Sequence, residues 1–340
     1  MKAMVLKKLC DLKVDPCPLE LEELPVPVPG SRDLLLKVST CGVCHTELDE
    51  IEGRTPPRLP VVLGHQVVGR VVSAGSDTGL FRTGDRVGVA WIFSACGACK
   101  FCLAGNENLC PMFTATGRDA DGGYAQYMVV PEAFAYSIPE YFSDAEAAPL
   151  LCAGAIGYRS LRLTGLRNGQ RLGLTGFGAS GHLVLKMARF RYPDTAIFVF
   201  ARSAEERAFA LELGAVWAGD GSEAAPDKLD AIIDTTPVWE PVVQALTQLE
   251  AGGRLVINAI RKEGDKKSLL DLDYPVHLWL EKEIKSVANI TRRDVDEFLS
   301  LAEAMCLKPE VQLFGLEQAN EALLQLKTGR IRGAKVLVID

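Results

Sequence analysis

From residue 171 onward, short apolar segments alternate with helical patterns at close spacing. The predicted strands are 171–175, 196–201, 231–234, 254–257 and 284–288, and the predicted helices between them are 180–190, 204–213 and 238–249. Parallel neighbours in a sheet need a long crossover connection, which a helix usually supplies. This order therefore predicts an α/β unit, a doubly wound parallel sheet with helices on both faces.

A glycine-rich turn joins the first of these strands to the first helix. Gly176, Gly178 and Gly181 form the pattern G-x-G-x-x-G between strand and helix. The first glycine permits a tight turn, the second lets a pyrophosphate approach the backbone, and the third lets the helix pack closely. The helix N-terminus then presents its N–H groups to the phosphates. This setting favours dinucleotide binding over an ordinary glycine-rich turn.

The end of the second strand indicates which dinucleotide binds. An acidic residue there would bond the ribose 2′-hydroxyl of NAD, but the strand ends in Ala201, Arg202 and Ser203. Arg202 and Ser203 can hold a 2′-phosphate, whereas the nearby Glu205 and Glu206 count against one. We expect NADP in preference to NAD, and the alternative is that Arg202 only caps a solvated helix.

The first 150 residues are rich in turn formers and contain short β-branched runs at 34–38, 67–72 and 86–89. Short strands with frequent turns predict a mostly β domain. After about residue 290 the pattern predicts helices at 294–305 and 316–326 and a strand at 334–339. This tail either extends the parallel sheet or returns to the first domain, and the pattern alone leaves both open. A length of 340 residues suits two domains.

Four of the ten cysteines lie close together, at Cys96, Cys99, Cys102 and Cys110. Tetrahedral zinc takes four thiolates, and short spacings let one loop wrap the ion. Four thiolates leave no open position, so the predicted site is structural. Ordinary unpaired thiols and disulfides are the alternatives. Disulfides are disfavoured because we expect a cytosolic location, where thiols stay reduced.

A second, weaker pattern consists of Cys44, His65 and Cys152. Two thiolates and one imidazole would bind zinc and leave a fourth position for substrate. Two thiolates cancel the charge of the ion, which keeps enough Lewis acidity to lower the pKa of a bound alcohol. From spacing alone, the alternative is that His65 is a structural residue and Cys152 a small buried one.

Charge and hydropathy bear on partners and location. Lys and Arg number 37 against 44 Asp and Glu, a net charge of -7, which argues against nucleic acid or an anionic membrane as partner. The start of the chain lacks the apolar stretch of a signal peptide, and no apolar run of about 18 residues occurs. We therefore expect a cytoplasmic protein without a membrane partner.

Taken together, the motifs resemble the zinc-dependent alcohol dehydrogenases of the medium-chain dehydrogenase/reductase family. The matching segments occur in the family's order and span nearly the whole chain: 41–46, 64–65, 84–87, 96–110, 121–125, 152–154 and 176–181. The resemblance implies a GroES-like, mostly β catalytic domain at 1–152 and 290–340, with the structural zinc lobe. It also implies a Rossmann coenzyme-binding domain at 153–289.

The resemblance also assigns roles to residues. It implies that Cys44, His65 and Cys152 bind a catalytic zinc, and that a second, structural zinc is bound by the four-cysteine lobe. Thr46 matches the hydroxyl that takes the alcohol proton. Trp91 matches an aromatic residue of the substrate pocket, and His45 a basic residue near the coenzyme phosphates.

Two positions depart from the family pattern. Gln66 replaces a glutamate that lies behind the zinc, so ligand exchange is expected to be slower or the metal less firmly held. Asp49 stands where a relay histidine is expected, and either the aspartate or water would carry the proton. Neither departure removes a zinc ligand.

The expected function is reversible oxidation of primary or secondary alcohols to aldehydes or ketones, with hydride transfer to NAD(P). A polyol- or cinnamyl-type dehydrogenase, an aldehyde reductase of the same family, or a non-catalytic zinc- and nucleotide-binding protein are the alternatives. The partners expected are a small alcohol or aldehyde and further copies of the chain, as a homodimer or homotetramer.

Overall fold

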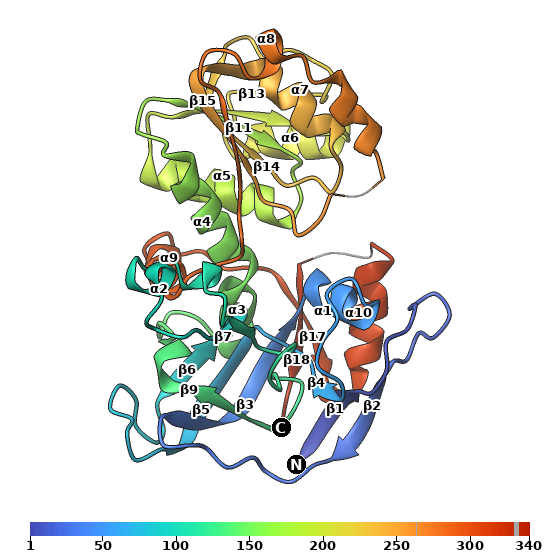
Figure 1. The fold of residues 1–340 in the computed structure, drawn as a ribbon, viewed down its shortest axis with the longest axis vertical. Coiled ribbons are helices and arrows are strands. Elements are labelled where there is room, and N and C mark those ends of the chain that lie inside the picture. Colours follow the sequence, from blue (N-terminus) through green and yellow to red (C-terminus); the bar gives the residue numbers. More distant parts are fainter. Residues whose placement is uncertain (263, 330–332) are drawn as a thin grey trace. The chain divides into compact units, whose positions relative to one another are not determined.

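The computed structural model describes residues 1–262, 264–329 and 333–340, which form two compact units. Unit 1 comprises Met1–Cys152 and Ile290–Asp340, and unit 2 comprises Ala153–Asn289. Both chain ends lie in unit 1 (Figure 1), so the chain leaves this unit, builds unit 2 and returns.

Unit 2 contains a six-stranded, all-parallel sheet in the order β13-β12-β11-β14-β15-β16. Its strands are β11 (Arg171–Thr175), β12 (Ala196–Phe200), β13 (Trp217–Gly219), β14 (Leu229–Asp234), β15 (Leu249–Ile257) and β16 (Glu283–Ser286). In chain order this is 3-2-1-4-5-6, the doubly wound arrangement, whose strand order reverses between β11 and β14. The predicted α/β fold class is confirmed.

The longer helices of unit 2 pack on this sheet, and the short last one packs against the α-helix before it (Figure 1). They are α4 (Ala153–Thr164), α5 (Ala179–Arg191), α6 (Ala204–Glu212), α7 (Glu240–Gln248) and the short α8 (Tyr274–His277). Strand β12 buries four consecutive residues, as expected of a strand covered on both faces. Among the residues that the structure describes, no helix is both long enough and apolar enough to cross a membrane.

Unit 1 is built around a seven-stranded sheet with the path β10-β6-β5-β3-β18-β17, and β9 also pairs with β3. These strands are β3 (Asp33–Val43), β5 (Val67–Ala74), β6 (Arg86–Val89), β9 (Tyr127–Pro131), β10 (Ala135–Ser137), β17 (Val311–Gly315) and β18 (Ala334–Val338). In β3, Leu34, Leu36 and Val38 are fully buried and alternate with more exposed residues. This period of two places every second side chain in the core.

Smaller elements complete unit 1. A three-stranded sheet contains β1 (Lys2–Leu6), β2 (Leu19–Glu23) and β4 (Val61–Val62). A two-stranded sheet contains β7 (Ile92–Ser94) and β8 (Thr114–Ala115). The helices are α1 (His45–Ile51), α2 (Lys100–Leu103), α3 (Asp144–Ala147), α9 (Arg292–Ala304) and α10 (Ala319–Lys327), and η3 (Ala148–Leu151) is a 3₁₀ turn.

The C-terminal tail joins the sheet of unit 1. Strand β18 pairs antiparallel with β3 and parallel with β17. Of the two courses that the sequence pattern leaves open, the structure therefore has the return to the first unit. The start of α9 is set by a capping box, in which Thr291 and Asp294 each accept a backbone N–H of the other.

Candidate metal centres and coenzyme site

Three elements of unit 1 bring Cys44, His65 and Cys152 together. Cys44 is the N-cap of α1, His65 lies between β4 and β5, and Cys152 follows η3. Their candidate ligand atoms all lie within 4.8 Å of one another, and the two Sγ atoms are 3.9 Å apart. His65 is only 1% exposed. The set offers three donors and leaves a fourth position of a tetrahedron open.

A buried carboxylate bridges two of these residues. Glu47 Oε2 accepts the backbone N–H of Cys44 at 2.8 Å, and Oε1 lies 2.6 Å from His65 Nδ1. A carboxylate on one ring nitrogen orients the imidazole and leaves Nε2 for a metal. The sequence interpretation missed Glu47. Its signal was a glutamate three residues after an N-cap, the spacing of a capping box.

The electrostatics of this cluster suit a cation. The thiol of Cys152, and to a lesser degree His65, hold the pKa of Cys44 well below its ordinary value, although burial opposes the shift. The same contact with Cys44, together with burial, holds the pKa of Cys152 well above its ordinary value. A dication would stabilise these two partly buried, neighbouring thiols as two thiolates.

The predicted proton-handling residues lie on α1. Thr46 Oγ1 is 3.6 Å from Cys44 Sγ. Asp49 is 3% exposed, and its Oδ1 accepts a hydrogen bond from Arg54 Nε at 2.6 Å. Gln66 is buried, and a Cβ added to Gly42 would meet its Oε1 at 2.6 Å, so the amide is packed closely against β3.

A second buried carboxylate was also missed. Glu50 is 1% exposed, and neither carboxylate oxygen has a hydrogen-bond partner among the described residues. Burial, and next the charge of Glu47, hold the pKa of the Glu50 carboxyl well above its ordinary value. A glutamate in a short polar helix looks solvated in the sequence, so no pattern marked it.

Trp91 belongs to an aromatic cluster in unit 1. Its ring centroid lies 4.8 Å from that of Phe113, and the guanidinium of Arg118 lies 5.3 Å from the Trp91 ring. The buried Nε1 of Trp91 has no hydrogen-bond partner among the described residues. Its role in a substrate pocket stays a prediction.

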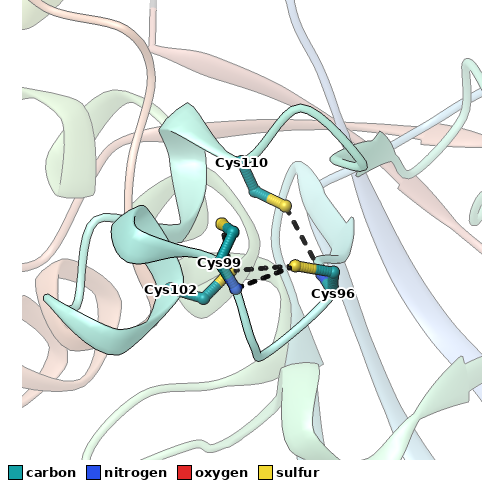
Figure 2. Close-up of side chains that lie close together, drawn as sticks. All are labelled: Cys96, Cys99, Cys102 and Cys110. Carbon is teal, nitrogen blue, oxygen red and sulfur yellow. Dashed lines mark hydrogen bonds between the residues drawn. The ribbon is translucent and has the colours of Figure 1, made fainter.

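The four-cysteine lobe forms a second candidate metal centre, shown in Figure 2. The ligand atoms of Cys96, Cys99, Cys102 and Cys110 lie within 4.8 Å of one another. The Sγ of Cys102 is 3.6 Å from that of Cys99 and 3.9 Å from that of Cys96. These separations exceed the S–S bond length of about 2.05 Å, and all ten cysteines are free thiols.

Backbone N–H groups favour the thiolate form in this lobe. The N–H groups of Ala98 and Cys99, and next the thiol of Cys110, lower the pKa of Cys96 to about 6. Desolvation raises the pKa of Cys102 to about 12. A cation shared among the four sulfurs would favour the thiolate form at each of them.

The glycine-rich turn lies at the carboxyl end of β11 in unit 2. Gly176 has a φ of +80°, and its N–H donates to Phe200 O at 2.9 Å. A Cβ on Gly181 would lie 2.7 Å from Gly176 O, so this position in the first turn of α5 has room only for glycine. Apart from Gly178 and its two chain neighbours, no atom of the described residues lies within 4 Å of a Cβ added to Gly178. The turn is thus tight on the protein side and open at Gly178, as a pyrophosphate requires.

The other predicted coenzyme residues are less constrained. Arg202 is exposed two residues after the end of β12, and Ser203 Oγ caps α6 by accepting the Glu206 N–H at 3.1 Å. Arg207 Nη1 donates to the carbonyls of Ala201 and Arg202, which fixes the backbone of this segment. His45 is exposed at the first residue of α1 and belongs to unit 1.

Comparisons with known proteins identify the family of the chain. Residues 30–140 match the family described as alcohol dehydrogenase GroES-like domain. The chain is 45% identical to "Probable alcohol dehydrogenase AdhA" of Mycobacterium tuberculosis over 332 residues, 96% of this chain and 94% of the relative.

Solved structures of similar fold include an NAD-dependent alcohol dehydrogenase, with a TM-score of 0.85 and 25% identity, covering 100% of both chains. A cinnamyl alcohol dehydrogenase from Sorghum bicolor has a TM-score of 0.84 and 26% identity, covering 99% of this chain and 97% of that one. The chain belongs to the zinc-type medium-chain alcohol dehydrogenases and is an oxidoreductase.

Proposed function

We propose that the chain binds two zinc ions and oxidises alcohols reversibly to aldehydes or ketones, with NADP as the preferred coenzyme. The observation that carries the proposal is the set of two partly buried thiols and one buried imidazole, which lies beside a hydroxyl and offers three donors instead of four. When bound there, zinc would act as a Lewis acid on the alcohol oxygen, and the nicotinamide would take the hydride.

The protein's own groups then have separate tasks. Cys44, His65 and Cys152 would hold the catalytic zinc, and the four cysteines of the lobe would hold the structural one. Thr46 would accept the alcohol proton, because its hydroxyl lies on the same side of α1 as the Cys44 thiol. Asp49 would pass that proton on, with Arg54 stabilising its charged form.

Glu47 provides a prediction about metal affinity. Glu47→Gln keeps an oxygen for the Cys44 N–H but removes the negative charge beside His65. We expect the affinity of the catalytic site for zinc to fall by about 10- to 100-fold, as is typical when the partner of a ligating histidine is lost. Competition with a chromogenic chelator measures this affinity. The zinc of the four-cysteine lobe is the internal control, and equal retention of both ions would contradict the role of Glu47.

Arg202 provides a prediction about the coenzyme. Arg202→Ala should raise the KM for NADP by about tenfold or more, since one charge-assisted hydrogen bond contributes about 1.5–3 kcal/mol. The KM for NAD should change little. Arg167→Ala, also exposed in unit 2 but in the loop four residues before β11, is the matched control. An equal change in both KM values would refute the proposed 2′-phosphate contact.

The assembly proposed is a homodimer or homotetramer. Strand β16 is an edge of the six-stranded sheet, and all four of its residues are exposed. An exposed edge strand presents unpaired N–H and C=O groups that can pair with a second copy. Analytical ultracentrifugation would measure the state in solution.

The function is tested by assaying the zinc-loaded protein with NADP and NAD on short aliphatic, aromatic and cinnamyl alcohols and the matching aldehydes. The cinnamyl substrates belong in this panel because of the Sorghum bicolor neighbour. We expect turnover that is faster with NADP. Coenzyme binding without turnover on any of these substrates would instead support a non-catalytic protein.

A further inference from the structure

A buried ion pair lies at the carboxyl end of the unit 2 sheet, close to the glycine-rich turn. Asp234 is the last residue of β14, and Lys262 follows β15 by five residues. The side chain of Asp234 is 0% exposed and that of Lys262 is 7% exposed, and Lys262 Nζ donates to Asp234 Oδ2. A charged pair this deep is costly to bury unless its hydrogen bonds are complete.

The hydrogen bonds of this pair are complete. Besides Asp234, Lys262 Nζ donates to the backbone carbonyls of Thr236 at 2.7 Å and Val238 at 2.8 Å. Thr236 Oγ1, at 3.3 Å, is a fourth acceptor. An ammonium group has three protons, so these acceptors use all of them. Lys262 is therefore not available as a direct ligand for a coenzyme phosphate. Its contacts hold the segment after β15 against the segment after β14.

The same network reaches the glycine-rich turn. Asp234 Oδ1 accepts the hydroxyls of Thr175 and Thr236, each at 2.7 Å, and Thr175 directly precedes Gly176. Thr235 Oγ1 donates to Thr175 O at 3.0 Å, and a Cβ on Gly176 would lie 2.7 Å from that hydroxyl oxygen. The ends of β11 and β14 and the chain after β15 are thus joined where the strand order reverses, which is where ligands bind in such sheets.

We propose that Asp234 and Lys262 are positioning residues for the coenzyme. The pair sets the distance between the turn at Gly176 and the segments 235–238 and 258–262, and so keeps the phosphate-binding backbone in its binding geometry. This inference rests on the proposed coenzyme site. The pair acts through the backbone and touches no phosphate. An error of about 1 Å in such positioning can change rates or affinities by about a hundredfold.

The test is Lys262→Met, with coenzyme affinity as the readout. We expect the dissociation constant for NADPH, measured by fluorescence titration, to rise by about tenfold to a hundredfold. The KM for the coenzyme should rise in parallel, whereas kcat at saturating coenzyme should change much less, which marks a loss of binding. Lys282→Met is the matched control, because Lys282 Nζ also joins two backbone carbonyls, those of Leu246 and Val276, before β16. This control should bind NADPH like the wild type.

A second variant separates positioning from stability. Lys262→Met leaves the Asp234 charge buried without its partner, so the single variant should melt at a lower temperature. Asp234→Asn combined with Lys262→Met removes both charges, and we expect the melting temperature to recover while the dissociation constant for NADPH stays raised. Wild-type NADPH affinity in the double variant, or in a folded single variant, would overturn the inference. A wild-type protein that binds neither NADPH nor NADH would overturn the proposed coenzyme site and this inference with it.

Discussion

Cys44→Ser is expected to reduce turnover on every alcohol by about a thousandfold or more and to leave one zinc ion per chain. A serine hydroxyl stays protonated near neutral pH and is a poor zinc ligand, so only His65 and Cys152 would remain at the catalytic site. The Lewis-acid contribution of a metal is several kcal/mol, and each 1.36 kcal/mol is tenfold in rate. Serine is also a good N-cap, so α1 should still begin at this residue.

Steady-state kinetics and the zinc content of the purified variant check this prediction. Cys41→Ser is the matched control, since Cys41 is a buried thiol three residues earlier on β3 and lies outside both metal clusters. The control should keep two zinc ions and most of the activity. A Cys44→Ser protein with wild-type turnover would show that the cluster around Cys44 is not the reacting site.

Cys99→Ala should destabilise the four-cysteine lobe without removing the catalytic zinc. Between Cys96 and Cys110, only Glu107 and Cys110 are buried, and α2 buries no residue. A segment without an apolar core depends on its metal, and zinc binding contributes about 10–16 kcal/mol in isolated zinc fingers. This protein is larger than a zinc finger, and we expect its free energy of unfolding to fall by several kcal/mol. That loss corresponds to a fall of about 5–10 °C in Tm.

Calorimetry, together with limited proteolysis, measures the effect of Cys99→Ala. New cleavage should occur between residues 96 and 110, because this stretch would lose its cross-link. Cys17→Ser changes an exposed thiol outside both clusters and should melt like the wild type. An unchanged Tm with two zinc ions still bound would contradict a structural metal in the lobe.

The sequence was most informative where the chemistry depends on few, closely spaced residues. The strand–helix alternation from residue 171 predicted five of the six parallel strands, and the sixth, β13, has only three residues and no pattern of its own. Helix α4 was missed because its glycines, Gly154 and Gly157, weaken the helical signal. The course of the tail could not be predicted, since the pairing of β18 with β3 joins residues about 300 positions apart.

The candidate site likewise has residues that a local pattern marks and residues that only the fold brings into place. The four closely spaced cysteines could be predicted as ligands from their pattern, whereas Cys44, His65 and Cys152 were predicted as ligands mainly through the family resemblance. The structure brings the members of each set together. Glu47 and Glu50 could not be predicted, because a glutamate is common on exposed helices and only the fold makes these two buried. The network of Asp234 and Lys262 was equally hidden, since it joins residues after two different strands.

Diffraction data collected at the zinc absorption edge from crystals of the zinc-loaded protein test the central claim most directly. The account predicts two anomalous peaks per chain, one bound by Cys44, His65 and Cys152 and the other by the four cysteines between residues 96 and 110. A single peak in the four-cysteine lobe, with the first cluster empty in a protein that still oxidises alcohols, would contradict it.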